Sequence, residues 1–393
     1  MENNNFSNSQ PPIIEGKEPD SDLSYEWVNQ MQEINKLEKG IPIFNFAEGI
    51  KDRKQDMEFR VIRKITETVF HNNLLQEYSP ETNKHNRYNN IIPYKHSIIS
   101  NIPDSFSDQD DDLSEVQNID GLNGLPSKAS TYINANFIND CFNRKKIFIA
   151  TQGPMKNTIA NFWKMVWYSD VKSVVMLCRL IEQERVECDQ YWPDNQEEQR
   201  QPLYIGQFTI NIEDEQTKDK LIIRKLNISK EEDDQIKTKI VIQYHWLGWP
   251  DHGVPDDDSY ETLEEIIDIM IQNANLGKRT VVHCSAGVGR TGTILSLVNL
   301  TMTLQYFANQ IKLLILKQLD INQHDYNAIE AIGPISQKLE LLTDKQKDEF
   351  RISIFGTVRR LREQRWGMVY TNVQYSYLYK YMEKAIKKML NNL

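Results

Sequence analysis

The sequence has little cysteine, no long apolar run and no excess of positive charge. Its 393 residues include four cysteines, whose spacing fits neither a dense disulfide framework nor a paired-cysteine metal site. Acidic residues outnumber basic ones by 56 to 46, whereas nucleic-acid-binding proteins usually carry a basic surface. No apolar run approaches the roughly 20 residues of a membrane-spanning helix. We therefore expect neither a nucleic-acid partner nor a membrane span.

The N-terminus also lacks a secretion signal, because MENNNFSNSQPP is polar where a signal peptide would be apolar. Residues 1–22 are rich in Asn, Ser, Pro and Glu, which predicts a disordered tail. Without such a signal we expect a cytoplasmic protein. The cytoplasm is reducing, so a reactive free thiol would survive there. Nothing in the sequence specifies an oligomeric state.

An acidic segment, residues 101–120, contains neither Lys nor Arg. The alternating aspartates at 108–112 resemble the start of a calcium-binding loop. The sixth position of that loop, however, is Leu113 rather than Gly, and the twelfth is Ile119 rather than Glu. We interpret the segment as a solvated loop, and we predict neither a bound metal nor another cofactor.

From residue 131 onward, short β-branched segments alternate with amphipathic ones, which predicts a packed α/β domain. Helices with one apolar face are expected at 158–168 and 260–272. Two further helices are expected at the N-terminal end of the domain, at 23–39 and 57–75. The strand candidates are 173–178, 204–212, 220–226, 239–246 and 280–283. We treat 23–393 as one domain with insertions near 101–130 and 306–350, the second of them helical.

Residues 280–293, TVVHCSAGVGRTGT, predict a strand, a Gly-rich turn and the start of an apolar helix. Gly287 and Gly289 allow successive backbone N–H groups to point toward one centre, and the helix N-terminus adds partial positive charge. This arrangement suits a phosphate group. It has no Walker lysine, and Cys284 stands at its base instead. Because the N–H groups and the helix N-terminus stabilise an anion, they favour the nucleophilic thiolate of Cys284.

Arg290 and Thr291 complete the chemistry of this turn. The planar fork of Arg290 suits two oxygens of a phosphoryl group and holds them as charge redistributes in the transition state. Thr291 can donate a hydrogen bond to sulfur when the thiolate leaves. The backbone that would surround the phosphoryl group belongs to Ser285, Ala286, Gly287, Val288 and Gly289. A structural cysteine after a core strand is the alternative, but it leaves the glycines and Arg290 unexplained.

The pattern His-Cys-x5-Arg-Thr-Gly, which begins at His283, resembles the signature loop of the protein tyrosine phosphatases. The similarity extends from about Met57 to Leu390. It implies a highly twisted mixed sheet flanked by helices, with the phosphate-binding loop between a strand and a helix. It also implies cofactor-free hydrolysis of phosphotyrosine in proteins through a cysteinyl-phosphate intermediate.

Two Trp-Pro-Asp tripeptides, at 192–194 and 249–251, compete for the role of general acid. A carboxylic acid must protonate the tyrosine oxygen as it leaves. The second tripeptide continues as His-Gly-Val-Pro between a predicted strand and helix, which suits a loop moving on hinges, with Trp249 as an apolar pivot. The family resemblance assigns the acid, and later the base, to Asp251. It assigns Asp194 to a structural segment.

The residues expected to recognise substrate begin with Asn-Arg-Tyr at 86–88, which resembles the family's phosphotyrosine-recognition loop. Tyr88 would form one wall of a deep slot that only a residue as long as phosphotyrosine can cross. Asn90 would hold the substrate backbone. By position, Glu182 would pair with Arg290 and orient it, and His283 would support the cradle.

Two residues depart from the family pattern. Glu187 stands where relatives often have a lysine. Tyr370 occupies the place of the glutamine that positions the hydrolytic water, although Gln374 matches the family's second glutamine. Tyr370 therefore keeps open an alternative, a phosphotyrosine-binding pseudophosphatase with little turnover. A lipid phosphatase would carry Lys or Arg inside the loop, and a dual-specificity enzyme would lack the Asn-Arg-Tyr segment.

Overall fold

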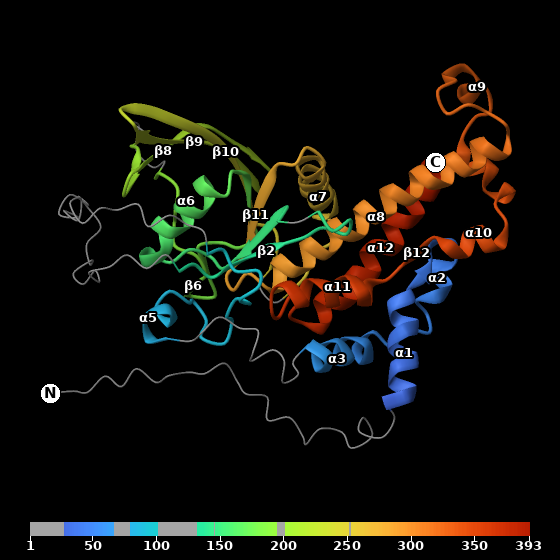
Figure 1. The fold of residues 1–393 in the computed structure, drawn as a ribbon, viewed down its shortest axis with the longest axis horizontal. Coiled ribbons are helices and arrows are strands. Elements are labelled where there is room, and N and C mark those ends of the chain that lie inside the picture. Colours follow the sequence, from blue (N-terminus) through green and yellow to red (C-terminus); the bar gives the residue numbers. More distant parts are fainter. Residues whose placement is uncertain (1–26, 67–78, 101–131, 145, 195–200, 251–252) are drawn as a thin grey trace.

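The computed structural model describes residues 27–66, 79–100, 132–144, 146–194, 201–250 and 253–393, and Figure 1 draws the rest as a thin grey trace. The predicted N-terminal tail, the acidic segment and Asp251 lie outside the described residues. Within them, no helix combines the length and apolarity needed to cross a bilayer. The same residues contain no cluster of three or more His, Cys, Asp or Glu side chains suited to a metal ion.

An eight-stranded mixed sheet forms the centre of the molecule, in the order β2-β3-β11-β4-β10-β9-β8-β7. Strands β3, β11, β4 and β10 run parallel to one another, and the other neighbouring pairs are antiparallel. The strands are β2 (Ala135–Ile138), β3 (Phe148–Thr151), β4 (Val171–Met176), β7 (Leu203–Ile205), β8 (Phe208–Lys218), β9 (Leu221–Glu232), β10 (Gln235–Trp246) and β11 (Arg279–His283). With helices packed around it, this sheet confirms the predicted fold class (Figure 1).

Burial distinguishes the central strands from the outer ones. Every residue of β3, and all of β11 except Arg279, is buried, as expected for parallel strands covered on both faces. Strands β9 and β10 are longer than their predicted ranges, 220–226 and 239–246. The added residues form the outer part of their hairpin, where the apolar alternation ends at Ile228 and polar or charged residues predominate.

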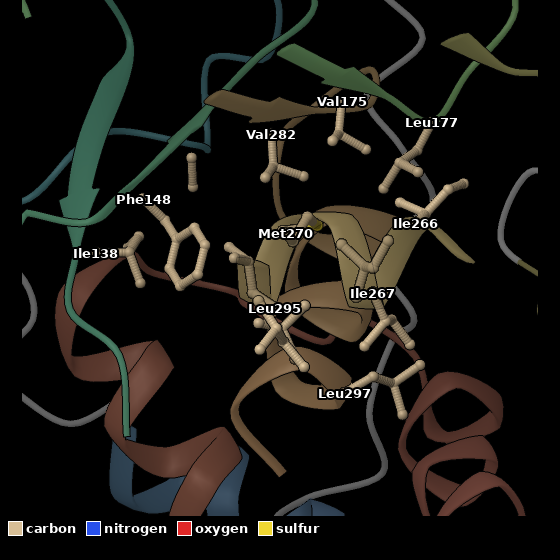
Figure 2. Packing of buried hydrophobic residues seen from close by; sticks show 14 of the residues in the cluster. Ile138, Phe148, Val175, Leu177, Ile266, Ile267, Met270, Val282, Leu295 and Leu297 are labelled. Carbon is tan, nitrogen blue, oxygen red and sulfur yellow. The ribbon is translucent and has the colours of Figure 1, made fainter. Parts of the chain in front are cut away.

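Helices α7 (Tyr260–Asn275) and α8 (Gly289–Gln318) pack against the central strands. Figure 2 shows Ile267 and Met270 of α7 and Leu295 of α8 close together beneath Val175 and Val282 of the sheet, and all five are fully buried. Helix α6 (Ile159–Tyr168) contacts β4 and β7. This packing fixes the end of β11, where the cradle begins, relative to the start of α8.

The C-terminal helices α11 (Ile354–Gln364) and α12 (Asn372–Asn392) pack along α8. The predicted helical insertion at 306–350 begins inside α8, whose Ile311 and Ile315 are fully buried. It continues through α9 (Tyr326–Ala331), η5 (Ile335–Leu341) and α10 (Asp344–Glu349). The backbone N–H of Ile335 donates to Leu393 at 2.9 Å, so η5 is tied to the end of the chain.

The N-terminal helices pack against the C-terminal helices α11 and α12. Helix α1 (Trp27–Lys39) packs on α11, and α3 (Gln55–Thr66) packs on both α11 and α12. Buried Glu58 of α3 accepts hydrogen bonds from the hydroxyls of Tyr375 and Tyr379. The remaining short elements are β1 (Ile41–Pro42), η2 (Ile43–Asn45), α2 (Phe46–Gly49), α5 (Pro80–Asn83), η4 (Lys156–Thr158), β5 (Ile181–Glu182), β6 (Arg185–Val186) and β12 (Arg351–Ile352).

Candidate active site

The cradle lies between the end of β11 at His283 and the start of α8 at Gly289. Gly287 adopts a φ of +70°, and a Cβ there would overlap the carbonyl of Thr151 on β3, so only glycine fits. The N–H of Gly153 donates to the carbonyl of Ser285 at 2.7 Å. The loop is therefore held by a backbone hydrogen bond to the segment that follows β3.

Cys284 sits at the base of this loop with 5% of its surface exposed. The hydroxyl of Thr291, on the first turn of α8, lies 3.3 Å from its Sγ. A hydrogen-bond donor next to sulfur stabilises a thiolate both before it attacks and when it leaves. The two residues therefore occupy the relative positions expected from the sequence.

His283 is a neutral structural support. Its Nδ1 lies 3.1 Å from the carbonyl oxygen of Cys284, and its Nε2 lies 2.8 Å from the hydroxyl of Tyr191. A carbonyl only accepts, so Nδ1 must carry the proton and Nε2 must accept from the tyrosine. Complete burial lowers the pKa of His283 to about 3, which keeps the ring uncharged. It therefore positions Cys284 and does not act as its base.

Arg290 is almost fully buried, with 2% of its surface exposed, and carboxylate and carbonyl groups hold its guanidinium. Its Nη1 donates to Glu182 Oε1 and to the carbonyl of Leu177, both at 2.8 Å, and its Nη2 pairs with Glu182 Oε2. This two-pronged pairing fixes the plane of the guanidinium. Glu182, on β5, thus occupies the orienting position proposed for it.

The predicted recognition loop lies beside the cradle. The hydroxyl of Tyr88 lies 2.9 Å from the Oγ of Ser285, and its ring is partly exposed. Arg87 anchors the loop by donating to the carbonyls of Pro154 at 2.7 Å and Val186 at 2.8 Å. Asn90 is exposed at the surface of this loop. Tyr88 therefore lies beside Ser285 of the cradle, whereas its predicted role as a wall of the substrate slot stays a prediction.

Of the two Trp-Pro-Asp segments, the structure describes all of 192–194 but only Trp249 and Pro250 of 249–251. Trp249 is buried, stacks edge-on against Trp246 at 5.5 Å, and donates from Nε1 to the carbonyl of Gly253 at 3.1 Å. It thus anchors the segment that carries Asp251, which lies outside the described residues. Asp194 is exposed and lines a separate cavity away from the cradle.

Tyr370 and Gln374 meet the cradle at Gly289. Gln374 is buried, and its Oε1 accepts from the N–H groups of Tyr370 at 3.1 Å and Thr371 at 3.3 Å. This capping box at the start of α12 uses the amide oxygen and leaves Nε2 beside Gly289. Tyr370 is 42% exposed, and its Cβ also lies near Gly289. Both side chains thus border the cradle from the C-terminal side.

Arg365 was not singled out in the sequence, yet it supports the cradle directly. Fully buried, it donates to the carbonyls of Gly287 at 2.8 Å and Ala286 at 3.0 Å, and to the side chains of Asn134 and Asn136. Holding these carbonyls outward leaves the loop's N–H groups free to face a ligand. Burial lowers its pKa to about 10, so it stays charged at neutral pH. Its partners lie far away in the sequence, so no local motif identifies it.

Comparisons with known proteins agree with this geometry. The family model described as protein-tyrosine phosphatase matches residues 82–322 and 335–384. Human receptor-type tyrosine-protein phosphatase zeta is 31% identical over 311 residues, 77% of this chain. Human tyrosine-protein phosphatase non-receptor type 12 is 29% identical over 311 residues, 79% of this chain. The chain spans 10% and 31% of the lengths of these two relatives.

A solved structure of a tyrosine phosphatase also matches this chain. The catalytic domain of human protein tyrosine phosphatase non-receptor type 18 superposes with a TM-score of 0.58 and 25% identity. The alignment covers 87% of this chain and 99% of that domain. A structure of that phosphatase in complex with HER2 phosphopeptides aligns with 86% of this chain at a TM-score of 0.57. The fold of this chain is therefore similar to that of this catalytic domain.

Proposed function

The chain belongs to the protein-tyrosine phosphatase family, and on that premise we propose that it hydrolyses phosphotyrosine in proteins through a cysteinyl phosphate on Cys284. One observation carries the proposal. The sulfur of Cys284, 3.3 Å from the Thr291 hydroxyl, lies at the base of the loop proposed to hold the phosphoryl group, and Glu182 holds the arginine of that loop. Cradle, nucleophile and arginine are the parts that phosphoryl transfer requires.

In the first step, the thiolate of Cys284 attacks phosphorus while the bond from phosphorus to the tyrosine oxygen breaks. Asp251 donates its proton to that oxygen, so neutral tyrosine leaves. Arg290 and the N–H groups of 285–289 stabilise the charge on the three equatorial oxygens. Because Glu182 already fixes the guanidinium plane, little reorganisation is needed during transfer.

In the second step, water attacks the phosphocysteine and the bond between sulfur and phosphorus breaks. Asp251, now a carboxylate, takes a proton from the water, and inorganic phosphate is released. Thr291 stabilises the departing thiolate through its hydroxyl. Gln374 and Tyr370 border the cradle at Gly289 and are the side chains proposed to contact the water.

The proposed substrates are phosphotyrosine-containing proteins. The position of Tyr88, whose hydroxyl lies 2.9 Å from Ser285 Oγ, supports this substrate class, because its ring as one wall of the slot would admit a long aromatic phosphoester. Ala286 and Val288 of the cradle are uncharged, whereas a polyphosphorylated lipid headgroup would call for additional cations. Asn90, which is exposed at the surface of this loop, is the residue proposed to hold the peptide backbone. The cytoplasm is the compartment we propose.

Measured turnover of p-nitrophenyl phosphate tests the proposal. Cys284→Ser should abolish turnover because a serine hydroxyl is far less acidic, while binding of a phosphotyrosine peptide persists. Asp251→Ala should lower kcat by roughly 10² to 10⁴, the usual contribution of a positioned proton donor. Asp194→Ala is the matched control, since Asp194 lines a different cavity, and it should keep near-native turnover. Turnover by Cys284→Ser within tenfold of the native rate would exclude Cys284 as the nucleophile.

A pseudophosphatase remains the second candidate, on one specific observation. Tyr370 replaces the water-positioning glutamine of the family, and the amide oxygen of Gln374 is already used in a helix cap. Binding without turnover would follow if no group aligned the water. Sustained release of inorganic phosphate from a phosphotyrosine peptide, beyond one equivalent per chain, would exclude this candidate.

A further inference from the structure

A surface at the end of the central sheet away from the cradle combines exposed apolar side chains with lysines. It is formed by the loop between β2 and β3, the loop between α7 and β11, and the part of α8 beside them, and we name it the basal face. Its principal residues are Phe142, Arg144, Lys146, Leu276, Lys278 and Tyr306. Phe142, Leu276 and Tyr306 are 47%, 67% and 48% exposed. Large apolar side chains gathered on one surface mark a site of interaction.

Contacts between side chains show that the basal face is continuous. The ring of Phe142 meets that of Tyr306 on α8 edge-on, with the ring centroids 5.8 Å apart. Arg144 donates from Nη1 to the carbonyl of Ala274, near the end of α7, at 3.1 Å. Three segments that are distant in the sequence are therefore held side by side.

The basal face is positively charged, although the chain as a whole has 56 acidic and 46 basic residues. The segments that form it, 141–169 and 269–319, contain neither Asp nor Glu. Lys146 and Lys278 are exposed, and among the described residues neither pairs with a carboxylate. Both ammonium groups are therefore available to an external anion.

The acids that border these segments do not offset this charge. Asp140 is 4% exposed and pairs with Arg144. Asp170 pairs with Lys172 at 2.7 Å. Asp268, about two turns before the end of α7, interacts electrostatically with a lysine of α12. The two exposed lysines thus give the basal face its net charge.

The shape of the basal face favours a lipid surface over a protein partner. Phe142 lies in a turn and Leu276 follows the end of a helix, so both project from the fold. A Cβ added to Gly277 would meet no atom within 4 Å, so the tip next to Leu276 is open on that side. Projecting apolar side chains need matching hollows in a protein, whereas the interface of a bilayer accommodates them without such hollows.

We propose that the basal face binds the surface of a bilayer that contains anionic phospholipid. Phe142, Leu276 and Tyr306 enter the headgroup region, and Lys146 and Lys278 contact the charged lipid groups. The basal face borders the starts of β3 and β11, and the cradle follows their ends. A chain bound in this way keeps the cradle on the side away from the lipid, where substrate can reach it.

Sedimentation of the full chain with vesicles tests the proposal. With about 30% phosphatidylserine in phosphatidylcholine, we expect half-maximal binding on the order of 1 mM accessible lipid or tighter. Vesicles of phosphatidylcholine alone should bind roughly tenfold more weakly. Inorganic phosphate that fills the cradle should not change binding at constant ionic strength. Absence of binding to the anionic vesicles, equal binding to both lipids, or competition by phosphate would overturn the proposal.

Charge-reversed variants locate the contact. Lys146→Glu combined with Lys278→Glu should weaken binding to the anionic vesicles by roughly tenfold or more. Lys345→Glu combined with Lys387→Glu is the matched control, because these lysines are exposed on α10 and α12 and the net charge changes equally. Equal weakening by the two double variants would indicate a general charge effect and would overturn the assignment. Urea denaturation checks that both are folded.

An apolar variant distinguishes a bilayer from an acidic protein surface. Leu276→Gln should weaken binding to the anionic vesicles by roughly three- to tenfold, because a leucine no longer enters the interface. Ile236→Gln, which removes a 75% exposed side chain from β10, should not weaken it. If Leu276→Gln bound as the parent chain does, the contact would be electrostatic alone, as with an acidic protein, and the bilayer proposal would be wrong. These measurements do not use turnover, so failure of the proposed activity would leave them intact.

Discussion

At the scale of single residues, Glu187 places a carboxylate beside the wall of the substrate slot. It is 5% exposed, and its Oε2 lies 3.5 Å from the hydroxyl of Tyr88, which in turn contacts Ser285 of the cradle. A phosphotyrosine dianion entering the slot therefore meets a negative charge in a partly desolvated region, where Coulomb interactions are stronger than in water. This residue should weaken substrate binding.

We predict that Glu187→Gln lowers KM for a phosphotyrosine peptide by roughly three- to tenfold and changes kcat less, because about 1 kcal/mol of repulsion is removed. Glu187→Lys should lower KM further. Glu231→Gln, on the exposed end of β9, is the control for net charge and should leave KM unchanged. Steady-state kinetics at pH 7 measure all three variants. An increase in KM for Glu187→Gln would show that the carboxylate assists binding.

Tyr370 is the residue proposed to affect the second chemical step, also through a single side chain. The oxygen of Gln374 already accepts from the N–H groups of Tyr370 and Thr371, so this amide can donate to a water but has little capacity left to accept from it. The phenol of Tyr370 offers a single hydroxyl on a stiff ring. Alignment of the water should therefore be poor, and the phosphocysteine should accumulate.

Rapid mixing with p-nitrophenyl phosphate should accordingly show a burst of nitrophenol near one equivalent, followed by a slower steady state. Tyr370→Gln should shrink the burst and raise the steady rate several-fold, about 1 kcal/mol of barrier. Gln374→Ala separates the two side chains, because it removes the amide but keeps Tyr370. No burst in the native chain, with no gain in the variant, would assign the water to another group.

At the scale of elements, the sequence predicted best the helices and strands whose residues are continuous in the chain and largely apolar. The strand, turn and helix around Cys284 lie within one continuous segment, so their residue types predicted the conformation that the structure shows. The longer extent of β9 and β10 was missed because polar and charged residues predominate beyond Ile228 and before Lys239. Arg365 was missed for a different reason. Its role depends on Asn134 and Asn136, which the sheet brings to it from β2 and the segment before it.

The packing of the cradle against β3 gives a prediction at this scale. Gly287→Ala should abolish turnover and lower the free energy of unfolding by several kcal/mol, because its Cβ would overlap the Thr151 carbonyl and φ is +70°. Gly277→Ala is the matched control, with φ +68° and open space around the added Cβ, and should cost about 1 kcal/mol. Urea denaturation compares the two. Equal losses would mean that φ alone, and not the contact with β3, requires glycine.

At the scale of the whole molecule, two buried histidines link stability to pH. Burial lowers the pKa of His283 to about 3 and that of His245 to about 4, whereas an unfolded histidine titrates near 6.5. Below about pH 6.5 the unfolded chain therefore binds protons that the folded chain does not. This contribution to stability is complete at neutral pH and is lost progressively as the pH falls toward 4.

We expect each histidine to lower the free energy of unfolding by about 2 kcal/mol between pH 7 and pH 5. His245→Gln keeps a donor for the carbonyl of Cys178, which His245 Nε2 contacts at 2.9 Å, and removes one titrating group. Its stability should fall less steeply than that of the parent chain over this interval, as measured by urea denaturation at several pH values. Parallel curves would show that His245 is protonated in the folded chain.

The two predicted insertions relate to the rest of the molecule in different ways, and one of them should be dispensable. Antiparallel pairing joins the chain on either side of 101–131, because Phe137 donates to Ser97 at 2.7 Å and Ile99 donates to Ala135 at 3.2 Å. The ends of the connection are therefore fixed by the sheet. Replacing 103–129 with about eight Gly and Ser residues should change the free energy of unfolding by about 1 kcal/mol, since closure entropy varies slowly with length. Turnover of p-nitrophenyl phosphate should be unchanged.

The second insertion, 306–350, differs from the first because it packs in the core. Its Ile311, on α8, is fully buried. Ile311→Ala should cost about 2 to 5 kcal/mol, because it leaves a cavity between packed helices. If replacing 103–129 destabilised the chain as much as Ile311→Ala, the acidic segment would have to bury apolar surface against the domain. The solvated-loop interpretation would then be wrong. If instead only Ile311→Ala is destabilising, the length of 101–131 can vary without affecting folding or catalysis. Residues 306–350 then belong to the core that positions α8 and, through α8, Arg290.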